Sequence, residues 1–572
     1  MEKIAGKLFT TPLVILLFLL ITGCIYSDEN QENQEEQISS SLPYIKATNG
    51  VKQLIVDDVS FAILGGELLN SSASSIEYMA PIWPRVKSLH VNTILLPVNW
   101  QQFESVEGEF DYSLIDNHIK KAHENGLRLI ILWFGSWKNG GSHYTPDWVK
   151  TDLNRFPRMR HKDQKITHTI SNINEECLKA DKTAYLKLME RIAQVDKHNT
   201  VIMMQIENEV GLLGGSRDFS PAATELFEQQ VPAKLIEHIN QNINKIKLVI
   251  REAYQNNGSK KQGSWAEVFG ASLLADEVFM AWNYATYINE IAHAGKAVHN
   301  IPTLVNAWVA DENENPGNWP SGGPNYRMLD VWQAGAPDID ILAVDNYLKN
   351  FGAKCKDFIH QGNPLFIPEA CAIWQNDRLG AGAKAFYTIG HHHAICFAPF
   401  GIDHDVYHDN HPIKSAYKAL NELMPLITNA QVENKINAFM EVDSSSPSSF
   451  VLGDYKFTVR YSLRKAPHIK GFGMVIQTGR DEFIVAGNAF KLSFESTDTN
   501  KPNAQLLSIE EGSFVDGKWQ KGRVLNGDEF RLNFPDKPYG LVENVVLEEV
   551  AVHKVKLFRH EEESNDENLT PF

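Results

Sequence analysis

Two glutamates follow short apolar runs closely and could act together as a pair of carboxyl groups. Glu209 lies three residues past the run Val201–Ile206, and Glu369 directly follows the run Leu365–Pro368. Two carboxyl groups at one site can divide the cleavage of a glycosidic bond, because one protonates the leaving oxygen and the other attacks the anomeric carbon. Each acid alone is weak evidence, since an acid after a strand is usually a solvated cap.

Two further acids compete for these roles. Glu207 precedes Glu209 by two residues and lies one layer deeper in an alternating strand, so we expect it in a buried polar layer. The same alternation places Ile202, Met204 and Ile206 on the outer side of the strand. Asp345 directly follows the apolar run Ile339–Val344 and is the third competitor.

The elements that must position these acids form a repeating pattern. Strand-sized apolar runs alternate with helical stretches such as Ser113–Asn125, whose apolar residues follow helical spacing before a stop at Gly126. Repeated βα units predict an α/β fold, a (β/α)8 TIM barrel whose chemistry lies at the carboxyl ends of its strands. Residues 220–300 are expected to be a mostly helical insertion. The predicted strands are Phe61–Gly66, Thr93–Val98, Leu127–Phe134, Val201–Ile206, Thr303–Trp308, Ile339–Val344, Leu365–Pro368 and His393–Phe400.

The C-terminal part of the chain follows a different pattern. Strand-sized pieces are separated by Gly, Asp, Asn and Ser, which predicts a smaller β-sandwich-like domain with a structural or carbohydrate-contacting role. The pieces are Val451–Tyr461, Gly471–Thr478, Glu482–Ala486, Ala489–Phe494 and Leu541–Val550.

The N-terminus resembles a bacterial lipoprotein signal. Lys3 and Lys7 precede the apolar run Leu8–Ile21, which stops at Thr-Gly-Cys24. Cleavage there leaves Cys24 as a lipid-attachment site; an ordinary signal peptide or a short membrane anchor is the alternative. The run is shorter than the ~20 apolar residues of a spanning helix. Residues 27–41 are acidic and poor in apolar side chains, which predicts a solvated tether.

Composition and charge exclude several classes of protein. Hydrophobic residues make up 43% and charged residues 22% of the 572 residues, which is typical of a globular protein. The 54 Lys and Arg against 71 Asp and Glu give a net charge of −17, which disfavours binding to nucleic acid. Five cysteines without a C-x-x-C pair do not indicate a thiolate zinc site. We expect no metal and no organic cofactor.

The segment Gln205-Ile-Glu-Asn-Glu-Val-Gly211 resembles the Q-I-E-N-E-Y-G signature of glycoside hydrolase family 35, the β-galactosidases of a large clan of retaining (β/α)8 hydrolases. Gly65–Asn70, Pro97–Glu104 and Glu107–Tyr112 are also similar to that family, and the resemblance spans about residues 55–420. It implies that Glu209 is the acid/base and Glu369 the nucleophile. Their carboxyl groups would then lie ~5–5.5 Å apart.

The sequence departs from the family at two positions. Gly135-Ser136-Trp137 stands where the better-known members have Ala-Glu-Trp, whose acid binds galactose hydroxyls, and Pro97 stands where they commonly have Tyr. The resemblance therefore implies a divergent bacterial subgroup, nearer to plant-wall-degrading enzymes.

Aromatic and amide side chains near the predicted strand ends suit a sugar site. Flat aromatic rings can pack on the C–H faces of sugars, although such rings also fill gaps in a core. The resemblance implies that Asn208 contacts the 2-hydroxyl and that Tyr347 orients Glu369. The expected substrate-binding residues are Glu67, Asn99, Trp137, Asn139, Asn208, Asn306, Trp308, Tyr347 and Trp374.

The expected organisation has five parts: a signal peptide (1–23), an acidic tether (24–50), the barrel (51–428), a β-rich domain (429–560) and an acidic tail (561–572). The expected function is that of a retaining exo-β-galactosidase acting on plant cell-wall oligosaccharides. We expect it in the bacterial cell envelope, anchored by lipid to the outer membrane. The alternatives are another retaining β-glycosidase, such as a β-glucosidase or arabinopyranosidase, and a non-catalytic surface glycan-binding lipoprotein.

Overall fold

The computed structural model describes residues 41–310, 314–371, 380–404, 413–441, 446, 448–461, 470–534, 538–542 and 545–561. The expected signal peptide with Cys24, the substrate-binding candidate Trp374 and residues 562–572 of the expected tail lie outside this part. Within it, no helix is both long enough and apolar enough to cross a membrane.

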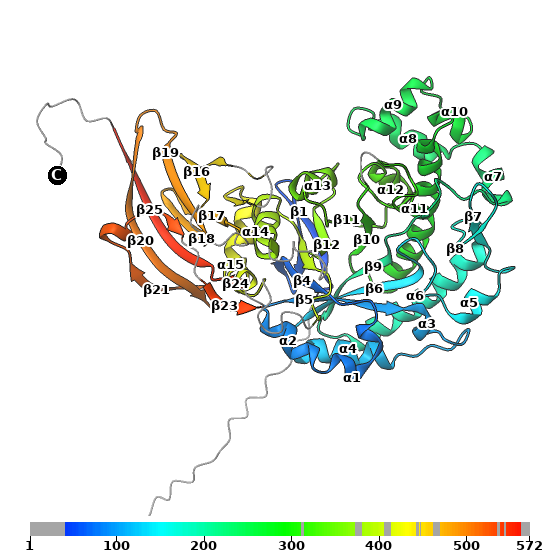
Figure 1. The fold of residues 1–572 in the computed structure, drawn as a ribbon, viewed down its shortest axis with the longest axis horizontal. Coiled ribbons are helices and arrows are strands. Elements are labelled where there is room, and N and C mark those ends of the chain that lie inside the picture. Colours follow the sequence, from blue (N-terminus) through cyan, green and yellow to red (C-terminus); the bar gives the residue numbers. More distant parts are fainter. Residues whose placement is uncertain are drawn as a thin grey trace, which may run out of the picture. The chain divides into compact units, whose positions relative to one another are not determined.

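The eight predicted strands form one parallel sheet that closes on itself (Figure 1). β13 pairs in parallel with β4, and a parallel bridge between Asn346 and Ala370 joins β11 to β12. The closed sheet confirms the predicted (β/α)8 barrel, with strand ends shifted by a few residues. In barrel order the strands are β4 (Ile63–Glu67), β5 (Thr93–Asn99), β6 (Arg128–Lys138), β9 (Val201–Asn208), β10 (Thr303–Trp308), β11 (Ile341–Asp345), β12 (Phe366–Ala370) and β13 (Cys396–Pro399).

The inside of the barrel is filled by alternate residues of its strands, among them Ile63, Leu95 and Ile130. Alternation fails at the start of β9, where Leu129 pairs with Val201 but Ile130 pairs with Met203. The extra residue, Ile202, packs with the interior cluster rather than on the outer side, so its predicted orientation was wrong.

The long connection between β9 and β10 is helical, as predicted. Ser220 caps α7 with Pro221 at its first turn, and Ser264 forms a capping box with Glu267 at the start of α10. The longest helix of the insertion, α11, packs against α6 (Glu175–Val195) on the barrel. The helices are α7 (Pro221–Glu228), α8 (Ala233–Gln241), α9 (Leu248–Asn256), α10 (Trp265–Phe269) and α11 (Leu273–Val298).

Three short antiparallel strands precede the barrel: β1 (Tyr44–Thr48), β2 (Val51–Val56) and β3 (Val59–Phe61). Leu54 and Val56 of β2 pack with the barrel interior. The tether was expected to extend to residue 50, but Tyr44–Thr48 is a paired strand because β2 offers it a complete antiparallel partner.

The C-terminal region is a two-sheet sandwich that follows α15 (Lys414–Val432). Phe439, Val475 and Phe483 of the larger sheet pack against Phe450 and Phe457 of the smaller one, which confirms the predicted β-rich domain. The larger sheet contains β14 (Ile436–Met440), β17 (Phe472–Gly479), β18 (Glu482–Asn488), β25 (Ala551–His560), β20 (Asn503–Val515) and β21 (Lys518–Val524). The smaller contains β15 (Ser449–Leu452), β16 (Tyr455–Tyr461), β19 (Phe490–Ser496) and β22 (Asn533–Phe534).

Two of the predicted strands in this domain each extend over two antiparallel strands that form a hairpin. Val451–Tyr461 is divided between β15 and β16, because Gly453 turns the chain with a φ of +57°. Leu541–Val550 is divided between β23 (Pro538–Val542) and β24 (Val545–Glu548).

Candidate active site

Three acids meet at the carboxyl ends of the barrel strands. Glu209 follows β9, Asp345 ends β11 and Glu369 lies in β12. One carboxyl oxygen from each lies within 4.8 Å of the other two. All three side chains are buried, at 6%, 1% and 6% exposure. The structure therefore brings the two predicted catalytic acids together and adds Asp345 to them.

The three acids line a cavity of about 360 Å³. Of the predicted substrate-binding residues, Asn139, Trp308 and Tyr347 line it as well, and Trp308 remains 40% exposed there. The complete lining is Asn70, Lys138, Asn139, Glu209, Trp308, Val309, Asp345, Tyr347, Leu348, Glu369 and Phe400.

The backbone at the end of β9 separates the roles of Glu207 and Glu209. Glu207 and Glu209 have positive φ angles of 62° and 45°, so the side-chain alternation of the strand ends there. The Glu207 carboxyl group accepts hydrogen bonds from the backbone N–H groups of Ser136 (2.9 Å) and Trp137 (2.7 Å). Glu207 thus belongs to a buried polar layer, as predicted, and does not line the cavity. Burial, and then the negative charge of Asp181, raise the pKa of Glu207 well above its usual value.

Three donors converge on Glu369. The Tyr347 hydroxyl donates to Oε2 at 2.6 Å, while the Nδ2 groups of Asn208 and Asn306 donate to Oε1 at 3.2 and 3.4 Å. Hydrogen bonds of this kind stabilise a carboxylate. Tyr347 and Glu369 are therefore in direct contact, as an orienting role for Tyr347 requires.

Glu209 has a very different environment. Burial, and next the negative charge of Glu369, raise its pKa to about 8, while Lys138 acts in the opposite direction. Its backbone N–H donates to Oδ1 of Asn306 at 3.0 Å, which connects it to the strand next to β9. At neutral pH Glu209 carries a proton that it can give to a leaving oxygen.

Lys138 was missed in the sequence. Its Nζ donates to Oδ1 of Asn208 at 2.6 Å and lies 4.5 Å from the ring centre of Phe134, and the side chain is 5% exposed. Strand β6 was expected to end at Phe134, but it continues to Lys138 and carries this ammonium group into the cavity. An apolar-run criterion stops at Gly135 and could not detect the continuation.

The structure corrects the predicted roles of Trp137 and Asn99. Trp137 is fully buried, its Nε1 donates to the carbonyl of Ile170 at 3.0 Å, and its ring packs edge-on against Tyr284 and Tyr287. It is a core residue that does not line the cavity. The Asn99 side chain caps the short helix α3 (Trp100–Phe103) by accepting from the N–H of Gln102 at 3.1 Å. It lines a separate small cavity.

Glu67 is a fully buried acid at the end of β4. Among the described residues, neither of its carboxyl oxygens has a hydrogen-bond partner. Burial, and then the charge of Glu369, raise its pKa well above the usual value, with Glu209 and Asp403 contributing in the same direction. Burial and the neighbouring negative charges thus favour the protonated form of Glu67, which does not line the cavity.

The three acids also form the one group with metal-ligand spacing among the described His, Cys, Asp and Glu residues. Lys138, which lowers the pKa values of Glu209 and Glu67, supplies a positive charge at this place. The arrangement is suited to holding and transferring protons.

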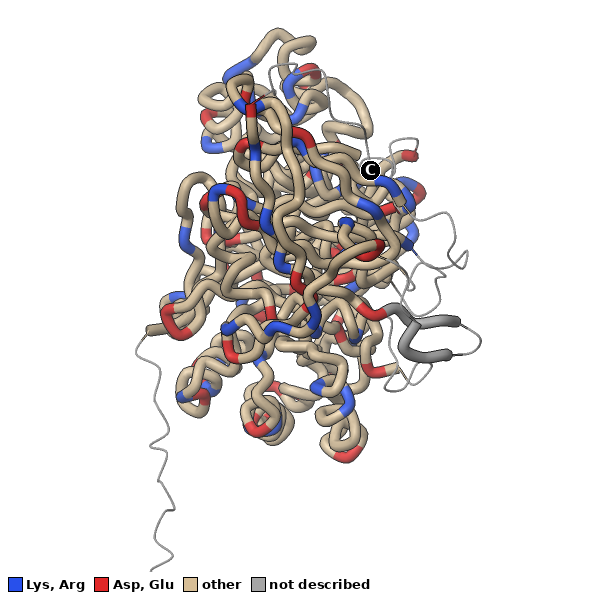
Figure 2. Tube along the Cα trace, turned by 90° about the vertical axis from the view of Figure 1, so that its left-hand side faces the viewer, with Lys and Arg blue, Asp and Glu red and all other residues tan. Residues whose placement is uncertain are grey.

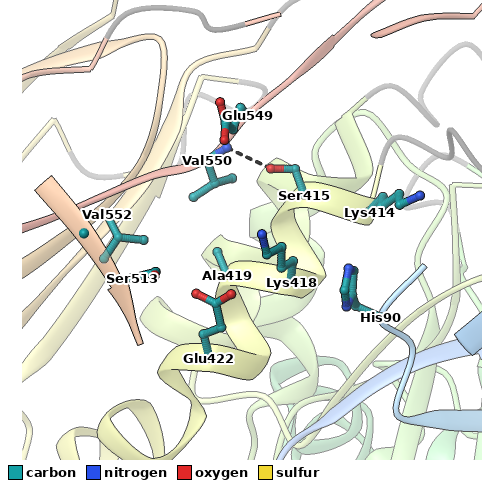
Figure 3. A pocket seen from close by; sticks show the side chains of 11 residues that line it. His90, Lys414, Ser415, Lys418, Ala419, Glu422, Ser513, Glu549, Val550 and Val552 are labelled. Atoms are coloured by element: carbon teal, nitrogen blue, oxygen red, sulfur yellow. Dashed lines mark hydrogen bonds between the residues drawn. The ribbon is translucent and has the colours of Figure 1, made fainter. Parts of the chain in front are cut away.

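A second cavity, of about 440 Å³, lies where α15 meets the C-terminal sandwich (Figure 3). His90, Lys414 and Lys418 face it together with the acids Glu422 and Glu549. The residues that line it include no Trp, Tyr or Phe ring, in contrast to the cavity at the barrel mouth. Acidic and basic residues are also interspersed over the described chain in Figure 2, with no continuous basic track.

Family models match two parts of the chain. Residues 53–280 match Glycosyl hydrolases family 35, a region that contains β4 to β9 and Glu209. Residues 413–534 match a domain of unknown function, DUF5597, which covers α15 and most of the sandwich. No curated protein sequence matches this chain.

The solved structures that this chain matches include two β-galactosidases and a mannosidase. The β-galactosidase from Bacillus circulans sp. alkalophilus has a TM-score of 0.44 and 12% identity, over 64% of this chain and 57% of that one. The β-galactosidase from the psychrophilic Marinomonas ef1 has a TM-score of 0.37 and 11% identity, over 59% and 53%. The exo-β-1,4-mannosidase from Opitutaceae bacterium strain TAV5 has a TM-score of 0.37 and 13% identity, over 62% and 54%.

This chain spans little more than half the length of each of these structures. The match to family 35 covers residues 53–280, which is less than half of the chain. The region around Glu209 thus resembles the glycosyl hydrolases of family 35, and it lies in the closed barrel that brings the three acids together.

Proposed function

We propose that this chain is a retaining exo-β-galactosidase that releases terminal β-galactosyl residues from plant cell-wall oligosaccharides. The observation that carries the retaining mechanism is the short separation of Glu209 and Glu369, since one carboxyl oxygen of each lies within 4.8 Å of the other. Inverting enzymes keep their carboxyl groups ~6.5–9.5 Å apart to leave room for a water molecule, whereas retaining enzymes keep them ~5–5.5 Å apart.

The two acids divide a double displacement between them. Glu369, whose carboxyl group accepts hydrogen bonds from three donors, attacks the anomeric carbon while Glu209 gives its proton to the leaving oxygen. The resulting Glu209 carboxylate then takes a proton from water, and that water releases the sugar from Glu369. Both acids end the cycle in the protonation states in which they began it.

The size of the site is compatible with a short sugar segment such as a chain end. The cavity of about 360 Å³ is near the lower limit of the ~300–1,000 Å³ typical of small-molecule sites. Trp308, partly exposed in the wall, offers a ring face to the sugar or to the group that leaves.

The position at which the family binds galactose with an acid differs in this chain. Ser136, at the position where the family has an acid that binds galactose, donates its hydroxyl to Asp181 at 2.6 Å and does not line the cavity. Lys138 enters the cavity two residues later. This difference favours a second candidate, another retaining β-glycosidase such as a β-glucosidase or arabinopyranosidase.

The test is hydrolysis of a panel of p-nitrophenyl β-glycosides, with Glu209→Gln and Glu369→Gln as catalytic controls. Preferential turnover of the galactoside that both substitutions abolish supports the proposal. Preference for another glycoside favours the second candidate. Absence of turnover on aryl glycosides and on galactose-terminated oligosaccharides would contradict both and favour a glycan-binding lipoprotein.

We also propose that the protein is anchored in the bacterial cell envelope by lipid on Cys24. The support is the sequence around Cys24 alone, and the proposed location is the outer membrane, on its periplasmic or outer face. Labelling with a fatty-acid analogue should mark the wild-type chain and not the Cys24→Ala variant. Equal labelling of the two, or none in either, would contradict the anchor without bearing on catalysis.

A further inference from the structure

Asp345 has no role in the double displacement, although one of its carboxyl oxygens lies within 4.8 Å of a carboxyl oxygen of both Glu209 and Glu369. We propose that Asp345 is a positioning residue that keeps a proton throughout the reaction cycle and donates it in a hydrogen bond to Glu209. The inference rests on the proposed function and specifies how the acid/base of that site is held.

The hydrogen bonds of Asp345 indicate where its proton lies. Oδ2 accepts from Nδ2 of Asn306 at 2.8 Å, so it behaves as an acceptor. Oδ1 is buried and has no hydrogen-bond partner among the described residues. An ionised Asp345 would leave Oδ1 without a donor, which is costly in a buried site. A protonated Asp345 can instead donate to the carboxyl group of Glu209, with which it forms a side-chain hydrogen bond.

The charges around Asp345 also favour the protonated form. The carboxyl groups of Glu67, Glu209 and Glu369 face it from three other strands, and Lys138 is the one Lys or Arg among the residues that line the cavity. Tyr347 already donates its hydroxyl proton to Glu369. Burial, followed by the charges of Glu369, Glu209 and Glu67, raises the pKa of Asp345 well above its usual value.

The proton on Asp345 supports Glu209 without being transferred. When Glu209 protonates the leaving oxygen, it becomes a carboxylate and the Asp345 O–H stabilises the new charge. When Glu209 takes a proton from water, the same hydrogen bond directs its carboxyl group. The proton that moves therefore travels between the leaving group, Glu209 and water, and Asp345 ends each step unchanged.

Two substitutions distinguish this role from that of an ionised Asp345. Asp345→Asn preserves a neutral side chain with a hydrogen-bond donor. Its kcat/KM should therefore stay within about threefold of the wild-type value, and kcat/KM should decline at the same high pH as in the wild type. Asp345→Ala removes the donor, so kcat/KM should fall roughly 10- to 100-fold and the decline should move to higher pH. Asp338→Asn, a substitution on the loop before β11, is the matched control.

A spectroscopic measurement tests the proton independently of activity. The infrared spectrum of the full chain labelled with ¹³C-aspartate should show a protonated carboxyl band at pH 7 that Asp345→Asn removes and Asp338→Asn retains. The proposal is wrong if Asp345→Asn removes no such band. It is also wrong if kcat/KM of Asp345→Asn declines at a lower pH than that of the wild type, because such a shift indicates the loss of a negative charge. A wild-type chain that keeps the band but hydrolyses no glycoside would contradict the proposed function and leave the proton assignment standing.

Discussion

The hydroxyl of Tyr347 donates a hydrogen bond of 2.6 Å to Oε2 of Glu369. This contact joins the residue two positions beyond β11 to the acid of the neighbouring strand β12. The hydrogen bond holds the Glu369 carboxyl group in position relative to Glu209. The geometry of the attack on the sugar therefore depends on this contact.

Tyr347→Phe should lower kcat more than it raises KM. A hydrogen bond to a charged group is worth about 1.5–3 kcal/mol, which corresponds to a loss of roughly 10- to 100-fold. Steady-state kinetics on an aryl glycoside measure the effect. Tyr78→Phe, at a tyrosine that is 55% exposed, is the control and should behave as wild type; equal activity of the two variants would refute the role of Tyr347.

The pH dependence of kcat/KM should report Glu209. Its pKa of about 8 means that the acid is protonated below this pH and loses its proton above it. Activity should therefore persist at pH 7 and decline above about pH 8. A profile measured from pH 5 to 10 tests this, and a decline that begins near pH 5 would show that Glu209 is not the acid.

Lys138→Met should move the decline of kcat/KM with rising pH to a higher pH. Lys138 lowers the pKa of Glu209, so its removal raises this pKa, and Asn208 also loses the donor to its Oδ1. We expect lower kcat/KM at neutral pH together with the upward shift. Lys150→Met, which removes an exposed ion pair with Asp147, is the control. An unchanged profile in Lys138→Met would contradict the electrostatic role.

Glu67→Gln should stabilise the protein at pH 8 but not at pH 5. The pKa of Glu67 is raised in the folded state, so its contribution to stability is complete below the unfolded pKa near 4.5 and is lost as the pH rises toward the folded pKa. The loss is about 1.4 kcal/mol per pH unit within that window. Gln cannot ionise, so the Glu67→Gln variant does not lose this stability as the pH rises.

Denaturant unfolding of both forms at pH 5 and pH 8 measures this difference. Glu109→Gln, at an exposed position, serves as the control and should show no pH-dependent gain. A Glu67→Gln variant that is less stable than wild type at pH 8 would mean that Glu67 is ionised in the folded protein.

Gly135→Ala should destabilise the end of β6. A Cβ at this position would clash with Nε1 of Trp133 and would lie 2.7 Å from both Oδ1 of Asp181 and Oε1 of Glu207. Overpacking of this kind typically costs about 1–3 kcal/mol, and the shift would also displace Lys138. Thermal unfolding and kcat/KM should both fall. A fully stable and active Gly135→Ala variant would show that this buried polar layer does not position the strand end.

The sequence predicted the barrel and the paired acids well because both depend on local signals. Each strand is an apolar run bounded by a helix, and both Glu209 and Glu369 follow such runs at the end where barrel sites lie. The buried polar character of Glu207 followed from the same alternation.

The wrong predictions concern the direction of side chains at the ends of strands. The local pattern of apolar and polar residues does not determine that direction. Trp137 points into the core, since β6 continues past Phe134, and Asn99 is used as a helix cap. Ile202 faces the interior because of a bulge that depends on pairing with β6. Lys138 was missed for the same reason as Trp137: neither can be placed without the register of neighbouring strands.

The most direct test of the central claim is the stereochemistry of hydrolysis by the wild-type protein. Proton NMR of the first sugar released from an aryl β-galactoside, recorded before mutarotation, identifies its anomer. Double displacement by Glu369 and Glu209 predicts that the β-anomer appears first, with no product from Glu369→Gln. Initial release of the α-anomer would show a single displacement and contradict the assignment of Glu369 as nucleophile.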